Sequence, residues 1–159
     1  MKKTAAVITV SDRSHRGERE DVSGPAVAKA LREAGFEITG SEIVPDEKEK
    51  IRVMLERYVE RAALVVTTGG TGVAKRDVTP EATEQVCDRM IPGIPEFMRS
   101  EGLKKTAMSP LSRAVCGVRG STLLLNLPGN PNGAVDSLQT VLPLLLHAME
   151  LLAGHTEHS

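Results

Sequence analysis

The sequence predicts an α/β fold with three layers, α/β/α, built around a mainly parallel central sheet. Short apolar runs rich in β-branched residues alternate along the chain with segments whose apolar residues recur at helical spacing. Compact apolar runs of this kind are typical of strands buried on both faces of a sheet. With 159 residues, 40% of them hydrophobic, the chain can bury one substantial core, and no low-complexity linker divides it. We therefore expect one domain over residues 1–159, with 154–159 as a frayed tail.

The first half of the chain alternates three strands with three helices. TAAVITV (4–10) predicts a strand, and a helix over about 25–34 follows a polar loop and ends at Gly35. FEITGSEIV (36–44) predicts the second strand, and 45–62 carries the apolar stripe of an amphipathic helix. ALVVTT (63–68) predicts the third strand. Thr79 and Pro80 then begin a helix with a capping hydroxyl and a proline in its first turn.

The second half is less regular. Residues 91–120 mix prolines and glycines with helical pieces, so we expect short helices and turns there. STLLLNLPGNP (121–131) predicts a buried strand that ends in a turn. Apolar residues from Val135 to Met149 mark a C-terminal helix, bent at Pro143. This alternation of strands and helices implies a parallel sheet covered on both faces.

Composition argues against several classes of function. A net charge of -1 without a basic stripe, and only 2% aromatic residues, disfavour nucleic acid binding. Cys87 and Cys116 lack the spacing of a zinc site, and we expect both to be reduced and buried. The longest apolar runs, such as VLPLLL, are shorter than the roughly 20 residues that cross a bilayer. We expect no signal peptide, no membrane association and a cytoplasmic location.

Polar segments follow the predicted strands, and they read SDRSH, PDE, TGGTGVAKRD and NLPGNP. Ligands of such sheets bind beyond the carboxyl ends of the strands, where these segments meet. The glycines let backbone N–H groups approach a ligand, and the start of the helix near Pro80 favours an anion such as phosphate. The spacing matches neither a Walker A loop nor a dinucleotide fingerprint. A plain strand-to-helix turn is an equal alternative for this loop.

Asp46 and Asp77 each precede a predicted helix. Asp46 could be an N-cap, with Glu49 at capping-box spacing. Asp77 needs another role, because Thr79 is the expected cap of the next helix. Two acids that face a phosphate would repel it unless a cation lies between them, which indicates Mg²⁺.

Other polar residues leave two interpretations open. Asp12 is either a further ligand contact or a turn former. The basic residues between 13 and 19 fit a solvated loop better than a site, although one of them could reach a phosphate. Ser112 and Arg113 in PLSRA either bind an anion or lie on a surface helix.

Taken together, TTGGTGVAKRDVTPEA, VPDE, PGIPEFMR, SPLSRA and NLPGNP, in combination, resemble the molybdopterin adenylyltransferase family of the MogA and MoaB type, which includes the G domain of gephyrin. The resemblance covers nearly the whole chain. It implies Mg²⁺-dependent transfer of AMP from ATP to the terminal phosphate of molybdopterin, with release of pyrophosphate, in molybdenum cofactor biosynthesis. It also implies a homotrimer, in some members paired into a hexamer, and a hand-over of the product to a molybdenum-insertion protein.

The resemblance also implies the site residues. Asp46 and Asp77 match the family's functional aspartates, for metal binding and substrate positioning, and Lys75 or Arg76 would neutralise charge. The nucleotide and pterin loop and the pocket-lining segments correspond to Thr68, Gly69, Gly70, Thr71, Gly72, Ser11, Asp12, Ser112, Arg113, Pro128, Gly129 and Asn130. The attacking phosphate has a second pKa of about 6 and is largely anionic at neutral pH, so no general base is needed.

Three alternatives compete with this interpretation. A MoaB-type module of the same fold would hold a pterin or nucleotide without transferring anything, and the presence of both Asp46 and Asp77 favours the enzyme over it. The related domain of competence-damage-inducible proteins would be expected with further domain sequence. A purely structural oligomerisation domain leaves the two acids and the glycine loop unexplained.

Overall fold

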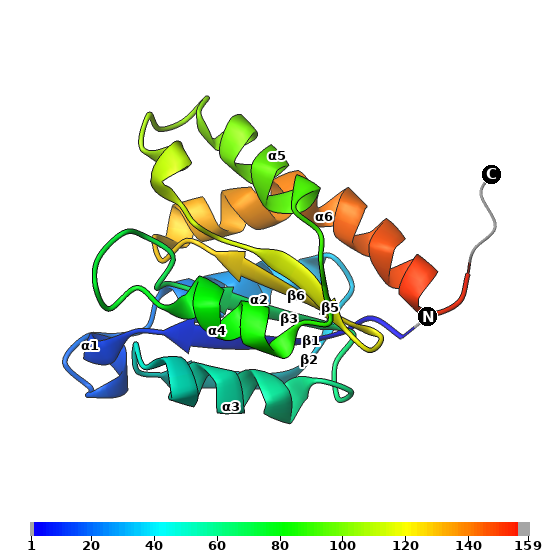
Figure 1. The fold of residues 1–159 in the computed structure, drawn as a ribbon, viewed down its shortest axis with the longest axis horizontal. Helices are drawn as coiled ribbons and strands as arrows, with labels where there is room; N and C mark the ends of the chain where they lie inside the picture. Colours follow the sequence, from blue (N-terminus) through cyan, green and yellow to red (C-terminus); the bar gives the residue numbers. More distant parts are fainter. Residues whose placement is uncertain (1, 156–159) are drawn as a thin grey trace.

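The computed structural model describes residues 2–155 as a sheet of six strands in the order β2-β1-β3-β6-β5-β4, with helices packed against it (Figure 1). Strands β2, β1, β3 and β6 run parallel, and β5 runs antiparallel to both β6 and β4. The elements in chain order are β1 (Thr4–Val10), α1 (Asp12–His15), α2 (Ser23–Glu33), β2 (Glu37–Val44), α3 (Lys48–Tyr58), β3 (Leu64–Thr68), α4 (Thr79–Val86), β4 (Arg89–Met90), α5 (Gly93–Gly102), η1 (Ser109–Leu111), β5 (Cys116–Arg119), β6 (Thr122–Leu127) and α6 (Pro131–Leu152). The predicted α/β class with a mainly parallel sheet is confirmed.

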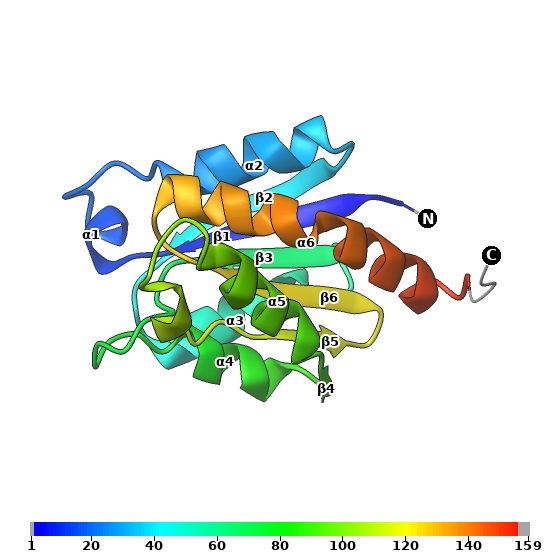
Figure 2. The same ribbon diagram turned by 90° about the horizontal axis from the view of Figure 1, so that it is seen from above.

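Helices cover both faces of the sheet, which makes the three predicted layers. Figure 2 shows α2, α6 and α5 over one face, and α3 and α4 pack on the other. Successive residues of β1 divide between the two cores: Ala5 and Val7 belong to the first, and Ala6 and Ile8 to the second. Burial on both faces explains why β1, β3 and β6 are apolar without alternation.

One predicted helix is shorter in the structure, and one predicted loop contains a short helix. The helix predicted over 45–62 ends at Tyr58, because Val59, with a ψ of 133°, leaves the helical conformation and Glu60 has a φ of 74°. Val59 and Ala62 still pack against the core from outside the helix. The polar loop after β1 contains α1, whose N-cap Ser11 accepts a hydrogen bond from the Ser14 N–H.

The region 91–120 contains α5 and η1, as expected for short helices, but β5 was not predicted, nor was β4 just before this region. Gly120, with a φ of 59°, lies between β5 and β6 and is followed by Ser121. A glycine and a serine between two strands are a hairpin signal, and it would have indicated the antiparallel pair. β5 is only four residues long and includes Gly117, so its own propensity for a strand is weak.

Helix α6 differs from the expectation that no segment is of bilayer length. Its 22 residues are long and apolar enough to cross a membrane by length and composition alone. However, Leu138, Val141 and Leu145 are buried in the core against the sheet, and the helix continues through Pro143. A core helix of a globular domain has the same properties, and we interpret α6 as one. Within the predicted tail, 156–159 lie outside the described residues.

The two cysteines are free thiols in different surroundings. Cys116 is buried as predicted, but Cys87 is only half-buried. Burial raises the pKa of Cys116 to about 12 and that of Cys87 to about 11. Both thiols are therefore protonated at neutral pH and poor nucleophiles.

Candidate functional site

A cleft of about 440 Å³ lies at the carboxyl ends of the parallel strands. β2 lies on one side of β1 and β3 lies on the other, so the order of the strands reverses at β1. Open α/β sheets bind ligands beside such a reversal. Loops after four strands meet in the cleft. They contribute, among others, Ser11, Ser14, Asp46, Gly69, Gly70, Asp77, Gly129 and Asn130.

The glycine loop after β3 is held in a conformation that other residues would strain. Gly69 and Gly70 have φ values of 100° and 70°. A Cβ on Gly69 would lie 2.3 Å from the carbonyl oxygen of Val10. The Gly69 N–H donates to the Leu127 carbonyl at 3.1 Å, and the Thr68 hydroxyl donates to the Pro128 carbonyl at 2.8 Å. The loop is thus fixed between the ends of β1 and β6.

The next N–H groups of this loop are unpaired. Within residues 2–155, the N–H groups of Gly70, Thr71 and Gly72 donate no hydrogen bond to another protein group. Backbone N–H groups are strong donors that normally find a partner. Consecutive unpaired donors beside a cleft form the kind of concave site that binds phosphate.

Thr79 has a different role from the predicted helix cap. Val78 is the N-cap of α4, and it makes no side-chain capping bond. The buried Thr79 hydroxyl instead donates to the Gly69 carbonyl at 2.9 Å, and the Thr79 N–H donates to the Gly70 carbonyl. The side chain therefore ties the start of α4 to the glycine loop.

Asp46 is not an N-cap either, because Glu47 occupies that position in α3 and makes no capping bond. One Asp46 oxygen accepts the N–H of Asp12 at 2.9 Å, and the Asp46 N–H donates to the Asp12 carboxylate at 2.9 Å. Burial raises the pKa of Asp46, and the charges of Asp12 and Asp77 raise it further. The cleft thus already contains closely spaced negative charge.

Asp77 faces the same cleft from the end of the glycine loop. Its Oδ2 accepts the N–H of Ala74 at 3.0 Å, and a Cβ on Gly72 would lie 2.8 Å from that oxygen. Glycine at 72 therefore leaves room for this carboxylate. The sequence predicts that Asp46 and Asp77 face one ligand, and both line the same cleft in the structure.

Arg76 of the glycine loop and Asp12, which follows β1, form an ion pair with two hydrogen bonds. Arg76 Nε and Nη2 lie 2.7 and 2.9 Å from the two carboxylate oxygens of Asp12. The Arg76 guanidinium lowers the pKa of Asp12 to about 2. Asp12 thus links the first two loops to the glycine loop, while the Lys75 side chain is exposed.

A second cleft, of about 460 Å³, adjoins the first at Asn130, which lines both. Asn130 also caps α6, its side-chain oxygen accepting the Gly133 N–H at 3.0 Å. This second cleft includes two methionines and a lysine together with the predicted Ser112 and Pro128. The methionines are Met98 and Met108 and the lysine is Lys105; Ser109, Asn132 and Asp136 also line this cleft.

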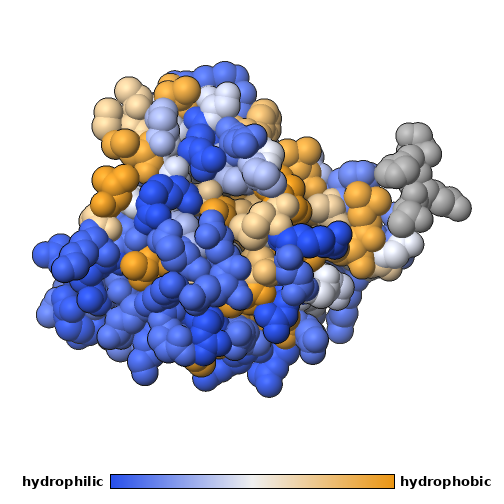
Figure 3. Space-filling model, viewed as in Figure 1, coloured by the Kyte–Doolittle hydropathy of each residue, from blue (hydrophilic) through white to orange (hydrophobic). Residues whose placement is uncertain are grey.

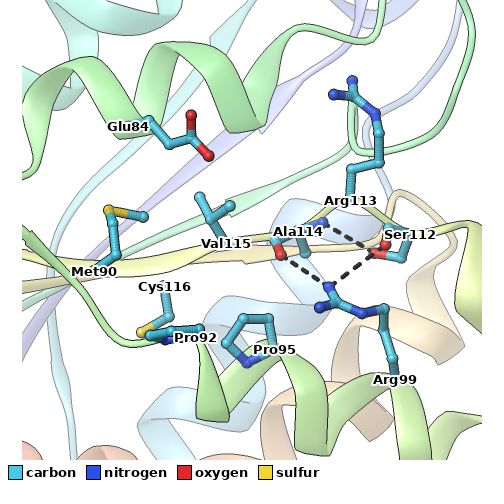
Figure 4. Close-up of a pocket in the computed structure, with 10 residues that line it drawn as sticks. All are labelled: Glu84, Met90, Pro92, Pro95, Arg99, Ser112, Arg113, Ala114, Val115 and Cys116. Atoms are coloured by element: carbon cyan, nitrogen blue, oxygen red, sulfur yellow. Dashed lines mark hydrogen bonds between the residues drawn. The ribbon is translucent and has the colours of Figure 1, made fainter.

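Arg113 lies in the segment between η1 and β5, so the surface-helix alternative for it is wrong. A further hollow, of about 430 Å³, lies beneath this segment (Figure 4). There Arg99 of α5 donates to the carbonyls of Ser112 and Ala114. Arg113 also lines the hollow, and its guanidinium points away from Arg99 (Figure 4). Arg113 instead contacts the glycine loop, as described below.

Residues of the first cleft that the sequence did not indicate come from the loop after α1. Arg19, Glu20 and Asp21 line it; of these, only Arg19 belongs to the basic residues of the expected solvated loop, one of which could reach a phosphate. Asp21 accepts the Thr9 hydroxyl at 2.8 Å and the Gly24 N–H at 3.0 Å. Asp21 lies two residues before the first residue of α2, and an acid just before a helix is a capping signal that would have drawn attention to it.

The chain is similar to known proteins over most of its length. Residues 6–147 match the family described as a probable molybdopterin binding domain. A molybdopterin adenylyltransferase of Helicobacter pylori is 41% identical over 153 residues, which cover 94% of this chain and 87% of that protein. The molybdenum cofactor synthesis protein cinnamon of Drosophila melanogaster is 40% identical over 153 residues, 94% of this chain, and the chain spans only 25% of its length. The crystal structure of the molybdopterin biosynthesis enzyme MoaB from Thermus thermophilus superimposes with a TM-score of 0.89 at 49% identity, covering 95% of this chain and 96% of that one.

Proposed function

The chain belongs to the family of probable molybdopterin binding domains, and on this premise we propose that it is a molybdopterin adenylyltransferase of molybdenum cofactor biosynthesis. In the proposed reaction, the terminal phosphate of molybdopterin attacks the α-phosphorus of ATP. The new phosphorus–oxygen bond forms as the bond to pyrophosphate breaks, and the products are adenylylated molybdopterin and pyrophosphate. The observation that carries this proposal is a cleft with unpaired N–H groups and two carboxylates, joined at Asn130 to a second cleft.

The two clefts suit two different substrates. The phosphates of ATP fit the first cleft, where the N–H groups of Gly70, Thr71 and Gly72 are available and the start of α4 adds a favourable dipole. Molybdopterin fits the second cleft, where methionines can pack against a ring. Lys105, which is paired with Asp136 at 2.8 Å, can exchange this contact for one with an anion. The reacting phosphates would then meet near Asn130.

The donor set fits Mg²⁺ in a site shared with a substrate. Among residues 2–155, no group of three or more His, Cys, Asp or Glu side chains could hold a metal alone. Mg²⁺ is commonly bound by one or two carboxylates together with substrate phosphates, which is what Asp46 and Asp77 offer. When bound, Mg²⁺ would neutralise part of the charge that carboxylates and phosphates bring together.

The remaining work of the protein is positioning. The attacking phosphate is largely ionised at neutral pH, so no residue needs to remove a proton. The loop N–H groups would hold the oxygens of the phosphate under attack, and Asp46 and Asp77 would orient it. The Asp12–Arg76 pair would hold the loops around the reactants together.

The test is AMP transfer by the pure protein. Incubation with ATP, Mg²⁺ and molybdopterin should release pyrophosphate and form adenylylated molybdopterin, and Asp77→Asn should abolish turnover without unfolding the protein. The binding-only module predicts intact binding of both ligands without transfer in the wild type. Full turnover by Asp77→Asn would refute the role proposed for that residue.

We further propose a homotrimer in the cytoplasm that passes its product to a metal-insertion protein. Support for self-association comes from exposed apolar side chains in the segment that follows α5: Leu103 and Leu111 are 52% and 54% exposed. Figure 3 shows hydrophobic side chains gathered over this part of the molecule. Patches of this kind commonly mark protein contact surfaces.

A further inference from the structure

Arg113 forms several hydrogen bonds with backbone carbonyls of the glycine loop. Its Nε donates to the Gly72 carbonyl at 2.8 Å, and its Nη2 donates to the Asp77 carbonyl at 2.7 Å. Its backbone N–H donates to the Thr71 carbonyl at 2.8 Å. The residue therefore contacts both ends of the segment that presents the Asp77 carboxylate.

Glu81 fixes the orientation of the Arg113 guanidinium. Its two carboxylate oxygens lie 2.6 Å from Nη1 and 3.2 Å from Nη2 of Arg113. Glu81 lies in the first turn of α4, a rigid element that begins against Gly70. A two-point contact between a planar guanidinium and a carboxylate restrains direction as well as distance.

The backbone of Arg113 is restrained from the opposite side. Arg99 of α5 donates to the carbonyl of Ala114 at 3.1 Å and to that of Ser112 at 3.5 Å (Figure 4). Arg113 thus connects α5 and α4 to a loop that has no regular secondary structure of its own.

We propose that Arg113 and Glu81 are positioning residues for AMP transfer, which hold the segment Gly72–Asp77 so that Asp77 faces the cleft, and that Arg113 does not bind a substrate anion. This inference rests on the proposed function. The two roles of Arg113 predict opposite effects of removing Glu81. A positioning arginine loses its orientation without Glu81, whereas an anion-binding arginine is freed from a competing carboxylate.

The experiment compares Arg113→Ala and Glu81→Ala with wild type. Hydrogen exchange of peptides covering 69–77, followed by mass spectrometry, should become faster in both variants, while the thermal unfolding temperature changes little. Because small displacements at a reaction centre cost about tenfold to a hundredfold in rate, kcat should fall about tenfold or more in both, with a smaller change in KM for ATP. Arg113→Lys should have a kcat between those of Arg113→Ala and wild type, since a single ammonium group cannot make all the hydrogen bonds that the three nitrogens of the guanidinium make. Arg52→Ala, which removes an arginine paired with Glu49 and Glu56 on α3, is the matched control and should leave exchange at 69–77 unchanged.

Two results would overturn the inference: unchanged exchange at 69–77 in both variants, or a Glu81→Ala enzyme whose kcat is not reduced. A raised KM for ATP in Arg113→Ala, without loss of kcat, would assign Arg113 to substrate binding instead. Failure of the wild type to transfer AMP would refute the proposed function, and hydrogen exchange would still decide whether Arg113 and Glu81 hold the segment Gly72–Asp77, because it reports the loop contacts without turnover.

Discussion

Asp46 sits where its negative charge is unfavourable for folding. Burial and the neighbouring carboxylates raise its pKa in the folded protein, so the ionised form is less stable there than in the unfolded chain. Such a position is typical of a functional group, since a structural role would not need the charge.

The first prediction concerns Asp46→Asn. At pH 7 this variant should unfold at a higher temperature than wild type and should fail to transfer AMP. The gain should shrink as the pH falls toward the ordinary carboxyl pKa of about 3.9, because wild-type Asp46 then becomes neutral as well. Thermal unfolding at pH 7 and pH 4 measures it, and a less stable variant at pH 7 would contradict the argument.

The pKa of Asp12 is shifted in the opposite direction from that of Asp46, because the bidentate contact with Arg76 lowers it from 3.8 to about 2. The ionised carboxylate therefore stabilises the fold above pH 3.8, and this contribution is lost as the pH falls through about 2. The second prediction is that Asp12→Asn lowers stability at pH 7 and that the difference from wild type narrows between pH 4 and pH 2. Urea unfolding between pH 4 and pH 2 measures the free energy of unfolding of both proteins. A difference that does not change with pH would show that the ion pair is not the cause of the lost stability.

At the scale of elements, the glycine loop depends on backbone geometry as much as on side chains. Gly69 combines a φ of 100° with a close approach to the Val10 carbonyl, whereas Gly17 has a φ of 75° and no heavy atom within 4 Å of an added Cβ. Gly17 thus isolates the cost of the conformation from the cost of crowding.

The third prediction uses this matched pair. Gly17→Ala should destabilise the fold by about 1 kcal/mol through its left-handed conformation. Gly69→Ala should cost about 3 kcal/mol or more, since crowding adds to the strain, and it should weaken ATP binding measured by calorimetry. Equal losses of stability in the two variants would show that the contact with Val10 does not constrain the loop.

A buried polar network supports the loop from the interior. Asn126 of β6 accepts the Val115 N–H at 3.1 Å and donates to the hydroxyls of Thr67 and Thr83, each at 3.0 Å. The Thr83 hydroxyl donates to the Thr79 carbonyl, and Thr79 holds the glycine loop. β3, β6, α4 and the segment before β5 are therefore joined beneath the site.

The fourth prediction follows from that network. Asn126→Ala should lower the free energy of unfolding by about 3 kcal/mol, because it leaves buried donors and acceptors without partners. Asn132→Ala, a substitution of an exposed asparagine in the first turn of α6, is the control and should have little effect. Urea denaturation measures both, and a loss below about 1 kcal/mol for Asn126→Ala would mean that the network relaxes around the gap.

The sequence predicted the elements whose signal is periodic and local. The apolar runs gave β1, β3 and β6, and the positions of Asp46 and Asp77 after predicted strands placed both acids in one cleft. What it missed depends on contacts between distant segments. The four residues of β5 become a strand because β6 pairs with them, and Thr79 bonds the Gly69 carbonyl instead of capping α4 because the loop folds back onto the helix.

At the scale of the whole molecule, the exposed apolar side chains after α5 need an explanation that one chain does not supply. Leu103 and Leu111 are each more than half exposed, whereas the described residues of α3 include a single exposed large apolar side chain, Val53. Single exposed apolar residues are ordinary, but a group of them marks a contact surface.

The fifth prediction is that this surface joins copies of the chain. Sedimentation of the wild type should give three times the 17.0 kDa mass of the chain, and Leu103→Glu or Leu111→Glu should shift it toward the monomer, because a buried unpaired carboxylate is costly. Val53→Glu adds the same charge on the opposite side of the sheet and should leave the assembly intact. A wild type that sediments at 17.0 kDa would refute self-association, and intact trimers of both leucine variants would place the contact elsewhere.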